Sequence, residues 1–187
     1  MLKKEIRVLG IDDSPFKKSQ KSKVLVVGTV FRGGLFLDGV LSTKVSIDGD
    51  DATEKIIEMI NKCKFKPQLQ CILLNGIAVA GFNIIDIKEL SEKTKIPVMV
   101  IIRKKPNIPL IKETLARINK SEKIALIEKA GSVTPIGKIY AQLAGIGIEK
   151  AKQILKITCT RSLIPEPIRI SHLIASGITD GESRGKA

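Results

Sequence analysis

Aromatic residues are scarce in this sequence: they make up 3% of it, with no tryptophan, one tyrosine and five phenylalanines. Hydrophobic residues nevertheless reach 43%, so a packed core must be built from isoleucine, valine, leucine and alanine. A chain of 187 residues has room for such a core, and no linker or repeat divides it, so we predict a single domain over residues 1–187. The few aromatic rings also leave little capacity for stacking on nucleic-acid bases.

Cysteine and long apolar runs are equally limited. The three cysteines, Cys63, Cys71 and Cys159, form no CxxC pair and no cluster with histidine, which predicts reduced thiols in a cytoplasmic protein. No apolar run approaches the roughly 18 residues that a membrane-spanning helix needs, so we expect no membrane span. Charged and apolar residues alternate over residues 1–10, which is not the pattern of a signal peptide.

Acidic residues are outnumbered by basic ones. The sequence has 32 lysines and arginines against 19 aspartates and glutamates, a formal net charge of +13. Such an excess favours a polyanionic partner, nucleic acid first. The basic residues are spread along the whole chain without a basic tail, so folding would have to assemble a binding face. The alternative is a lysine-rich composition with a solvated cationic surface.

Hydrophobic patterning predicts three strands followed by alternating helices and strands. Apolar or alternating runs predict strands at 6–10, 24–31, 35–47, 69–74, 98–102 and 138–144. Helical patterns follow residue 51 and cover 84–93, 108–130, 148–158 and 168–176. The opening strands should be antiparallel and the later crossovers parallel, which gives an α/β fold: a ribonuclease-H-like mixed sheet with helices on both faces.

Two adjacent carboxylates, Asp12 and Asp13, follow the first predicted strand at its carboxyl end, the edge where α/β sheets usually bind ligands. Mg²⁺ prefers a few carboxylates together with waters and phosphate oxygens, so Asp12 is a candidate metal ligand. Neighbours on an extended chain point to opposite faces, so Asp12 and Asp13 would share a metal only if the chain turned between them. The alternative for Asp13 is a cap in a turn with Ser14 and Pro15.

A second acidic group, Asp48-Gly49-Asp50-Asp51, precedes a predicted helix. Asp48 and Asp50 alternate as in a calcium loop, but the rest of that pattern is absent. Acidic residues here also suit the start of a helix, where the backbone dipole favours negative charge. In the functional alternative, Asp48, Asp50 or Asp51 is a metal ligand that joins Asp12 across the sheet.

Basic residues follow the predicted strand at 98–102 and occur again on the last predicted helix. Arg103 and Lys104 come directly after the strand at 98–102 and are candidates to bind phosphate, with a solvated loop as the alternative. Arg169 and His172 are three residues apart and so share one helical face. His172 is the only histidine, and a lone histidine on an apolar helix can be structural. Beside Arg169, it could instead address a phosphate or a metal-bound water.

Several segments together resemble an archaeal family of unknown function over nearly the whole chain: GIDDSPFKK, VVGTVFRGG, FLDGVLSTKV, DGDDATEKI, LNGIAVAGFNIID and IPEPIRISHLIASG. That family is itself similar, at lower specificity, to endonuclease V. Gly10-Ile11-Asp12 resembles the G-V-D element of the first strand of endonuclease V. The segment from Pro165 to His172 resembles its C-terminal P-E-P-x-R-x-A-H helix.

Endonuclease V cuts DNA or RNA near a deaminated adenine and uses Mg²⁺ held by carboxylates. The resemblance implies that Asp12 is a metal ligand, that His172 lies near the metal-bound water, and that Mg²⁺ or Mn²⁺ is the cofactor. Its lysine after a G-V-A-K strand falls near Arg103 or Lys104. Its F-R-E glutamate falls near residues 48–51. The P-Y-x-P wedge has no counterpart, because Arg32-Gly33-Gly34 occupies the predicted hairpin.

The aspartate of the D-G-h-G strand of endonuclease V falls on Asn75. An amide lacks the negative charge that balances Mg²⁺. A nuclease would therefore need the fold to bring the carboxylate of Asp50 or Asp86 close to Asp12. The presence of asparagine at position 75 therefore leaves three hypotheses for the function of the protein. The first is a Mg²⁺-dependent nuclease, and the second is a catalytically inactive nucleic-acid-binding module. The third is a protein of another function on the same fold.

Overall fold

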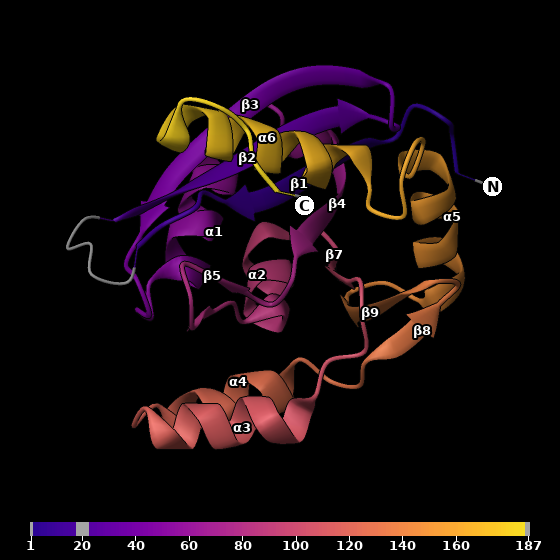
Figure 1. Cartoon of the computed structure of the whole chain (residues 1–187). Coiled ribbons are helices and arrows are strands. Elements are labelled where there is room, and N and C mark those ends of the chain that lie inside the picture. Colours follow the sequence, from indigo (N-terminus) through magenta and orange to yellow (C-terminus); the bar gives the residue numbers. More distant parts are fainter. Residues whose placement is uncertain (1, 18–22, 186–187) are drawn as a thin grey trace.

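The computed structural model describes residues 2–17 and 23–185 and has a seven-stranded mixed sheet at its centre (Figure 1). The strand order is β3-β2-β1-β4-β7-β9-β8. The strands are β1 (Arg7–Asp13), β2 (Val24–Arg32), β3 (Phe36–Val45), β4 (Leu69–Asn75), β7 (Val98–Ile102), β8 (Thr134–Ile136) and β9 (Ile139–Ala144). A separate short hairpin pairs β5 (Ala78–Val79) with β6 (Asn83–Ile84), which the sequence pattern did not predict.

The strand directions agree with the prediction except at one edge of the sheet. β1, β4 and β7 are parallel, and β2 and β3 are antiparallel neighbours beside them. The expected parallel crossover into 138–144 is wrong, because β9 runs antiparallel to β7. The chain first forms β8 and then reverses through a hairpin at Gly137, whose φ of 62° suits glycine in a tight turn.

Helices cover both faces of the sheet, as predicted. α1 (Ala52–Lys62) and α2 (Ile87–Thr94) lie on one face, and α5 (Ile148–Thr158) and α6 (Glu166–Asp180) lie on the other (Figure 1). Because strand side chains alternate, Leu9 and Ile11 enter the first core, whereas Val8 and Leu73 enter the second. Both cores are mainly aliphatic, as the shortage of aromatic residues requires, and Phe31 is an aromatic member of the second.

A small helical arm leaves the sheet after β7. It consists of α3 (Ile108–Arg117), a 3-10 turn (Ser121–Lys123) and α4 (Ile124–Lys129), and it forms a separate layer in Figure 1. Its apolar side chains Leu115 and Ile127 pack with Ile84 of β6 in a third cluster. A further 3-10 turn (Lys66–Gln68) precedes β4. Within the described residues, no helix has both the length and the hydrophobicity needed to cross a membrane.

Lys123 fixes this arm to the loop before α1. Its side chain is 1% exposed. The ammonium group donates to the main-chain oxygens of Asp48, Gly49 and Phe82 at 3.1, 2.5 and 2.8 Å, and it pairs with the carboxylate of Asp50 at 2.8 Å. Four oxygen partners replace the water that the buried cation has lost, so the contact is satisfied and holds the arm in place.

Asp86 starts α2 and gives the fold a measurable pH dependence. Its Oδ1 accepts hydrogen bonds from the backbone N–H groups of Lys88 and Glu89, and Oδ2 lies 2.5 Å from the ammonium of Lys129. Burial raises the pKa of Asp86, but these hydrogen bonds and the Lys129 charge outweigh it and hold the pKa below its ordinary value. Such a carboxylate stabilises the fold above its unfolded-state pKa, and this contribution is lost as the pH falls through the lower folded-state pKa.

We therefore expect Asp86→Asn to be less stable than the wild type near neutral pH and equally stable in strong acid. Asparagine keeps the capping oxygen but removes the charge that attracts Lys129. Urea unfolding of both proteins between about pH 7 and about pH 3 measures the difference. Asp86→Ala is the comparison that also loses the cap, at a further cost of about 1 kcal/mol. A difference between wild type and Asp86→Asn that stayed constant with pH would contradict this assignment.

Candidate functional site

The site begins where β1 and β4 end side by side. Ile11 lies opposite Leu74 in this parallel pair, which places Asp12 beside Asn75 at the carboxyl edge of the sheet. Nδ2 of Asn75 donates a hydrogen bond of 3.1 Å to Oδ2 of Asp12. Asp12 is 4% exposed, so its carboxylate lies in a largely buried position at the ligand-binding edge.

Asp13 points away from Asp12, as strand alternation predicts. Its Oδ2 accepts a hydrogen bond of 2.8 Å from the backbone N–H of Ala80, in the segment after β5. The backbone N–H of Asp13 donates to Oδ1 of Asp12 at 3.0 Å. Burial raises the pKa of Asp13 above its ordinary value. Asp12 is therefore the carboxylate that faces α6, and Asp13 anchors the neighbouring loop.

His172 of α6 completes a cluster around Asp12. Its Nδ1 lies 3.0 Å from Oδ2 of Asp12, and its Nε2 lies 3.2 Å from the carbonyl oxygen of Arg184. Both partners accept hydrogen bonds, so the two contacts together require either the imidazolium form of the ring or a proton on Asp12. Burial, and then the charge of Asp13, raise the pKa of Asp12 to about 6. One proton can thus be held between Asp12 and His172.

Small residues allow α6 to approach β1 closely enough for this contact. A side chain at Gly10 would collide with the start of α6, because its Cβ would lie 2.5 Å from the backbone nitrogen of Ile168. The hydroxyl of Ser171 donates to the carbonyl oxygen of Gly10 at 2.8 Å, and the hydroxyl of Thr29 donates to the carbonyl oxygen of Pro167 at 2.7 Å. These contacts fix the helix that carries His172.

A cavity of about 580 Å³ opens beside His172 and gathers the cationic residues that the sequence analysis selected. Arg103 and Lys104 approach it from the loop after β7, and Arg169 approaches it from α6. Glu166 orients Arg169 by accepting hydrogen bonds of 2.9 and 2.7 Å from its guanidinium, which raises the pKa of Arg169. The sequence motif contained Glu166, but only the folded helix shows this role.

The acidic group at residues 48–51 has other partners. Asp51 accepts hydrogen bonds from the backbone N–H of Ser46 and from Nδ2 of Asn83, and Oδ1 of Asp48 accepts one from the backbone N–H of Phe82. Asp50 pairs with Lys123, as described above. Over residues 2–17 and 23–185, no hydrogen bond or ion pair joins these three carboxylates to Asp12.

The structure therefore brings together Asp12, Asn75, His172, Arg103, Lys104 and Arg169, and it gives Asp48, Asp50 and Asp51 a part in holding the loop before α1. Asp86, the other carboxylate considered as a replacement for the charge missing at Asn75, caps α2. Among the described residues, no group of three or more His, Cys, Asp or Glu side chains is arranged to hold a metal ion.

Sequence comparison relates the chain to a defined family. The profile of a family described as endonuclease dU matches residues 4–179. A protein of Methanothermobacter thermautotrophicus described as a UPF0215 protein is 50% identical over 194 residues, covering 100% of this chain and 94% of that protein. A protein of Methanosarcina barkeri with the same description is 47% identical and covers 100% of this chain and 97% of its own length.

Comparison with solved structures agrees with the fold. A protein of unknown function from Archaeoglobus fulgidus has a TM-score of 0.86 at 42% identity and covers 92% of this chain and 97% of its own. Endonuclease V from Bacillus subtilis has a TM-score of 0.61 at 13% identity, with coverages of 91% and 79%. Endonuclease V from Ciona intestinalis, in complex with inosine-containing DNA, has a TM-score of 0.55 at 18% identity, with coverages of 88% and 82%. The predicted ribonuclease-H-like fold, of the endonuclease V type, is confirmed.

Proposed function

Because the chain belongs to the endonuclease dU family, we propose that it is a metal-dependent endonuclease that cuts DNA near a deoxyuridine. The observation that carries this proposal is the meeting of a buried carboxylate, Asp12, with His172 next to a cavity lined by three cations. A carboxylate and a histidine could bind and orient an attacking water, and cations could bind the phosphate, so this arrangement supports phosphodiester cleavage. The net charge of +13 supports binding to a polyanion.

The side chains around Asp12 fit a Mg²⁺ or Mn²⁺ ion whose coordination shell would be completed by phosphate oxygens of the substrate. Mg²⁺ usually keeps several waters and needs only one or two protein carboxylates together with phosphate oxygens. Asp12 is a buried carboxylate whose pKa is raised, and its side-chain partners are Asn75 and His172. A divalent cation would stabilise its ionised form. A bound cation of this kind lowers the pKa of its water and neutralises charge that develops on phosphate.

Each residue of the site then has a distinct task. Asp12 would hold the metal ion, and Asn75 would orient Asp12 by its hydrogen bond. His172 would position the attacking water, and its contact with Asp12 would orient the imidazole ring. Arg103, Lys104 and Arg169 would hold the phosphate through charge-assisted hydrogen bonds.

A second candidate function is nucleic-acid binding without turnover. The observation that favours it is Asn75, which stands where a second carboxylate would balance the metal charge. With a single carboxylate at the site, the metal ion would be held weakly in the absence of substrate. This candidate retains the cationic cavity and differs from the first only in catalysis.

Cleavage and binding assays on one set of substrates separate the two candidates. Duplex DNA with one deoxyuridine, DNA with one deoxyinosine and undamaged DNA are incubated with the protein in Mg²⁺, in Mn²⁺ and in EDTA. We expect cutting of the deoxyuridine substrate that requires the metal, together with binding that weakens as salt rises. Salt-sensitive binding without cutting would replace the first candidate by the second. Binding that was absent or insensitive to salt would contradict both.

A further inference from the structure

Two cavities lie on either side of the loop that joins α5 to α6. The first is the cavity of about 580 Å³ beside His172, and the second, of about 460 Å³, lies between α5 and the β8–β9 hairpin. Ser162 and Leu163 line both cavities. These two residues, the Leu163 ridge, therefore form a wall that the cavities share, and a ligand that crosses the ridge can occupy both.

The second cavity lies at the same edge and on the same face of the sheet as Asp12 and His172. Ile102, the last residue of β7, lies opposite Tyr140 near the start of β9, so the β8–β9 turn lies at the carboxyl edge of β7. The lining residue Ile139 packs in the core cluster that lies beneath α5 and α6. The Leu163 ridge is thus continuous with the proposed cleavage site.

Leu163 is an exposed leucine on a fixed backbone. Its exposed fraction is 54%. The hydroxyl of Ser162 donates to the carbonyl oxygen of Ile164 at 2.9 Å and accepts from its backbone N–H at 3.1 Å, and Ile164 is buried in the core. A large apolar side chain that is held between two cavities can insert between neighbouring bases, and leucine is one of the residues that DNA-binding proteins use in this way.

Cations flank the Leu163 ridge on both sides. Arg103, Lys104 and Arg169 line the first cavity, and Lys138 and Lys152 line the second. Among the residues that the structure describes, no aspartate or glutamate lines either cavity. A nucleic-acid strand combines apolar base faces with a regular series of anionic phosphates, so it fits an apolar ridge with cations on both sides.

We propose that an unpaired stretch of the DNA strand crosses the Leu163 ridge, with Leu163 between two consecutive bases and with Lys138 and Lys152 on the phosphates beyond it. This inference rests on the proposed function and extends its substrate contacts from the cavity beside His172 into the second cavity. Separating stacked bases costs least at a mismatched or damaged position. The ridge therefore favours DNA that is already weakened at the lesion, such as a deoxyuridine opposite guanine.

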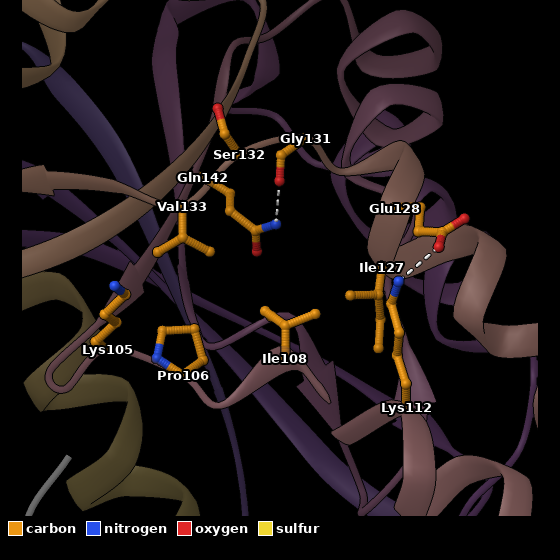
Figure 2. Close-up of a pocket in the computed structure, with 10 residues that line it drawn as sticks. All are labelled: Lys105, Pro106, Ile108, Lys112, Ile127, Glu128, Gly131, Ser132, Val133 and Gln142. Carbon is orange, nitrogen blue, oxygen red and sulfur yellow. Dashed lines mark hydrogen bonds and ion pairs between the residues drawn. The ribbon is translucent and has the colours of Figure 1, made fainter. Parts of the chain in front are cut away.

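A smaller cavity on the opposite face of the sheet supplies a matched control (Figure 2). It has a volume of about 210 Å³ and lies between the loop after β7 and the segment from α4 to β8. Strand pairing puts its lining residue Gln142 in one row of the sheet with Ile11, so it faces away from Asp12. Lys112 on its wall pairs with Glu128 at 2.6 Å, as Figure 2 shows.

Fluorescence of 2-aminopurine tests the role of Leu163, because this base becomes brighter when it is unstacked. It is placed at successive positions beside a single deoxyuridine in duplex DNA, and saturating protein is added in EDTA so that no cleavage occurs. We expect the wild type to raise the fluorescence by about two-fold or more at neighbouring positions, and Leu163→Ala to lose most of this rise. Leu110→Ala, which truncates a leucine of α3 that is 52% exposed, should behave as the wild type. No rise with the wild type, or an equal rise with Leu163→Ala, would overturn the inference.

The salt dependence of binding tests the two lysines. The dissociation constant for single-stranded DNA with one deoxyuridine is measured by fluorescence anisotropy at several salt concentrations. Each phosphate contact contributes about 0.7 to the logarithmic slope, so Lys152→Gln should lower it by about 0.7 and Lys138→Gln/Lys152→Gln by about 1.4. Lys112→Gln should leave the slope unchanged, although Lys112, like Lys152 beside Glu149, pairs with a glutamate. An unchanged slope in the double variant, or an equal change in Lys112→Gln, would count against this path of the strand.

Thermal unfolding confirms that each variant is folded. Absence of cleavage combined with unstacking that depends on Leu163 would contradict the nuclease proposal alone. Cleavage without such unstacking would contradict this inference alone, so the two failures are distinguishable.

Discussion

Asp12→Asn is expected to abolish metal-dependent cleavage without destabilising the protein. The change removes the carboxylate that we assign to the metal ion, so activity should fall by more than the roughly 10–100-fold that loss of an indirect metal partner costs. Burial and the Asp13 charge raise the pKa of Asp12 to about 6, so its ionised form opposes folding as the pH rises above its unfolded-state value of 3.8. Removing that charge should leave the melting temperature at pH 7 at or above the wild-type value.

The matched control is Asp38→Asn. Asp38 pairs with Arg7 and Arg32 at the opposite end of the strands, so the same chemical change is made away from the site. Cleavage of the deoxyuridine substrate and a thermal melt are measured for both variants. Activity retained by Asp12→Asn, or an equal loss in Asp38→Asn, would remove Asp12 from the mechanism.

Gly10→Ala should be the most damaging single-methyl change in the sheet. The new Cβ would overlap the backbone of Pro167 and Ile168, and backbone cannot move aside as a flexible side chain can. α6 would have to shift, which strains the hydrogen bond from Ser171 to residue 10 and separates His172 from Asp12. We expect a loss of about 2–4 kcal/mol in the free energy of unfolding, combining overpacking with a weakened buried hydrogen bond. Cleavage should fall with it.

Gly28→Ala is the control for this change, because Gly28 lies on the neighbouring strand. Its added Cβ would meet the side-chain ends of Leu9 and Met59 at 3.0 and 3.4 Å, which can adjust. Urea unfolding should show a much smaller loss, and cleavage should persist. Equal effects of the two substitutions would mean that the position of α6 is not what Gly10 protects.

Local hydrophobic patterns in the sequence predicted many of the strands and helices. The apolar runs at 69–74 and 98–102 became β4 and β7, and the helical spacing of Ile56 and Ile60 became the buried face of α1. These predictions succeed because burial imposes a period of two on a strand and 3.6 on a helix, and both periods are visible in a short window. The same reasoning placed Asp12 at a strand end, since the boundary between an apolar run and a polar loop is also local.

What the sequence did not determine depends on packing between distant segments. His172 reaches Asp12 across 160 positions because Gly10 lets α6 lie close to β1, and no local pattern contains that approach. The local sequence would predict an exposed side chain for Lys123, yet the folded arm buries it among four oxygen partners.

The sequence pattern by itself selected Asp12, His172 and the cationic residues Arg103, Lys104 and Arg169 as candidates, and the family resemblance added expected roles for Asp12 and His172. The tertiary structure decided which of the candidates surround Asp12: Asn75, His172 and the cations of one cavity, and not the acidic group at residues 48–51. The physical reason is that carboxylates bind whichever donors folding brings within reach. Asp48 accepts a hydrogen bond from the backbone of Phe82, Asp50 pairs with Lys123, and Asp51 accepts a hydrogen bond from Asn83.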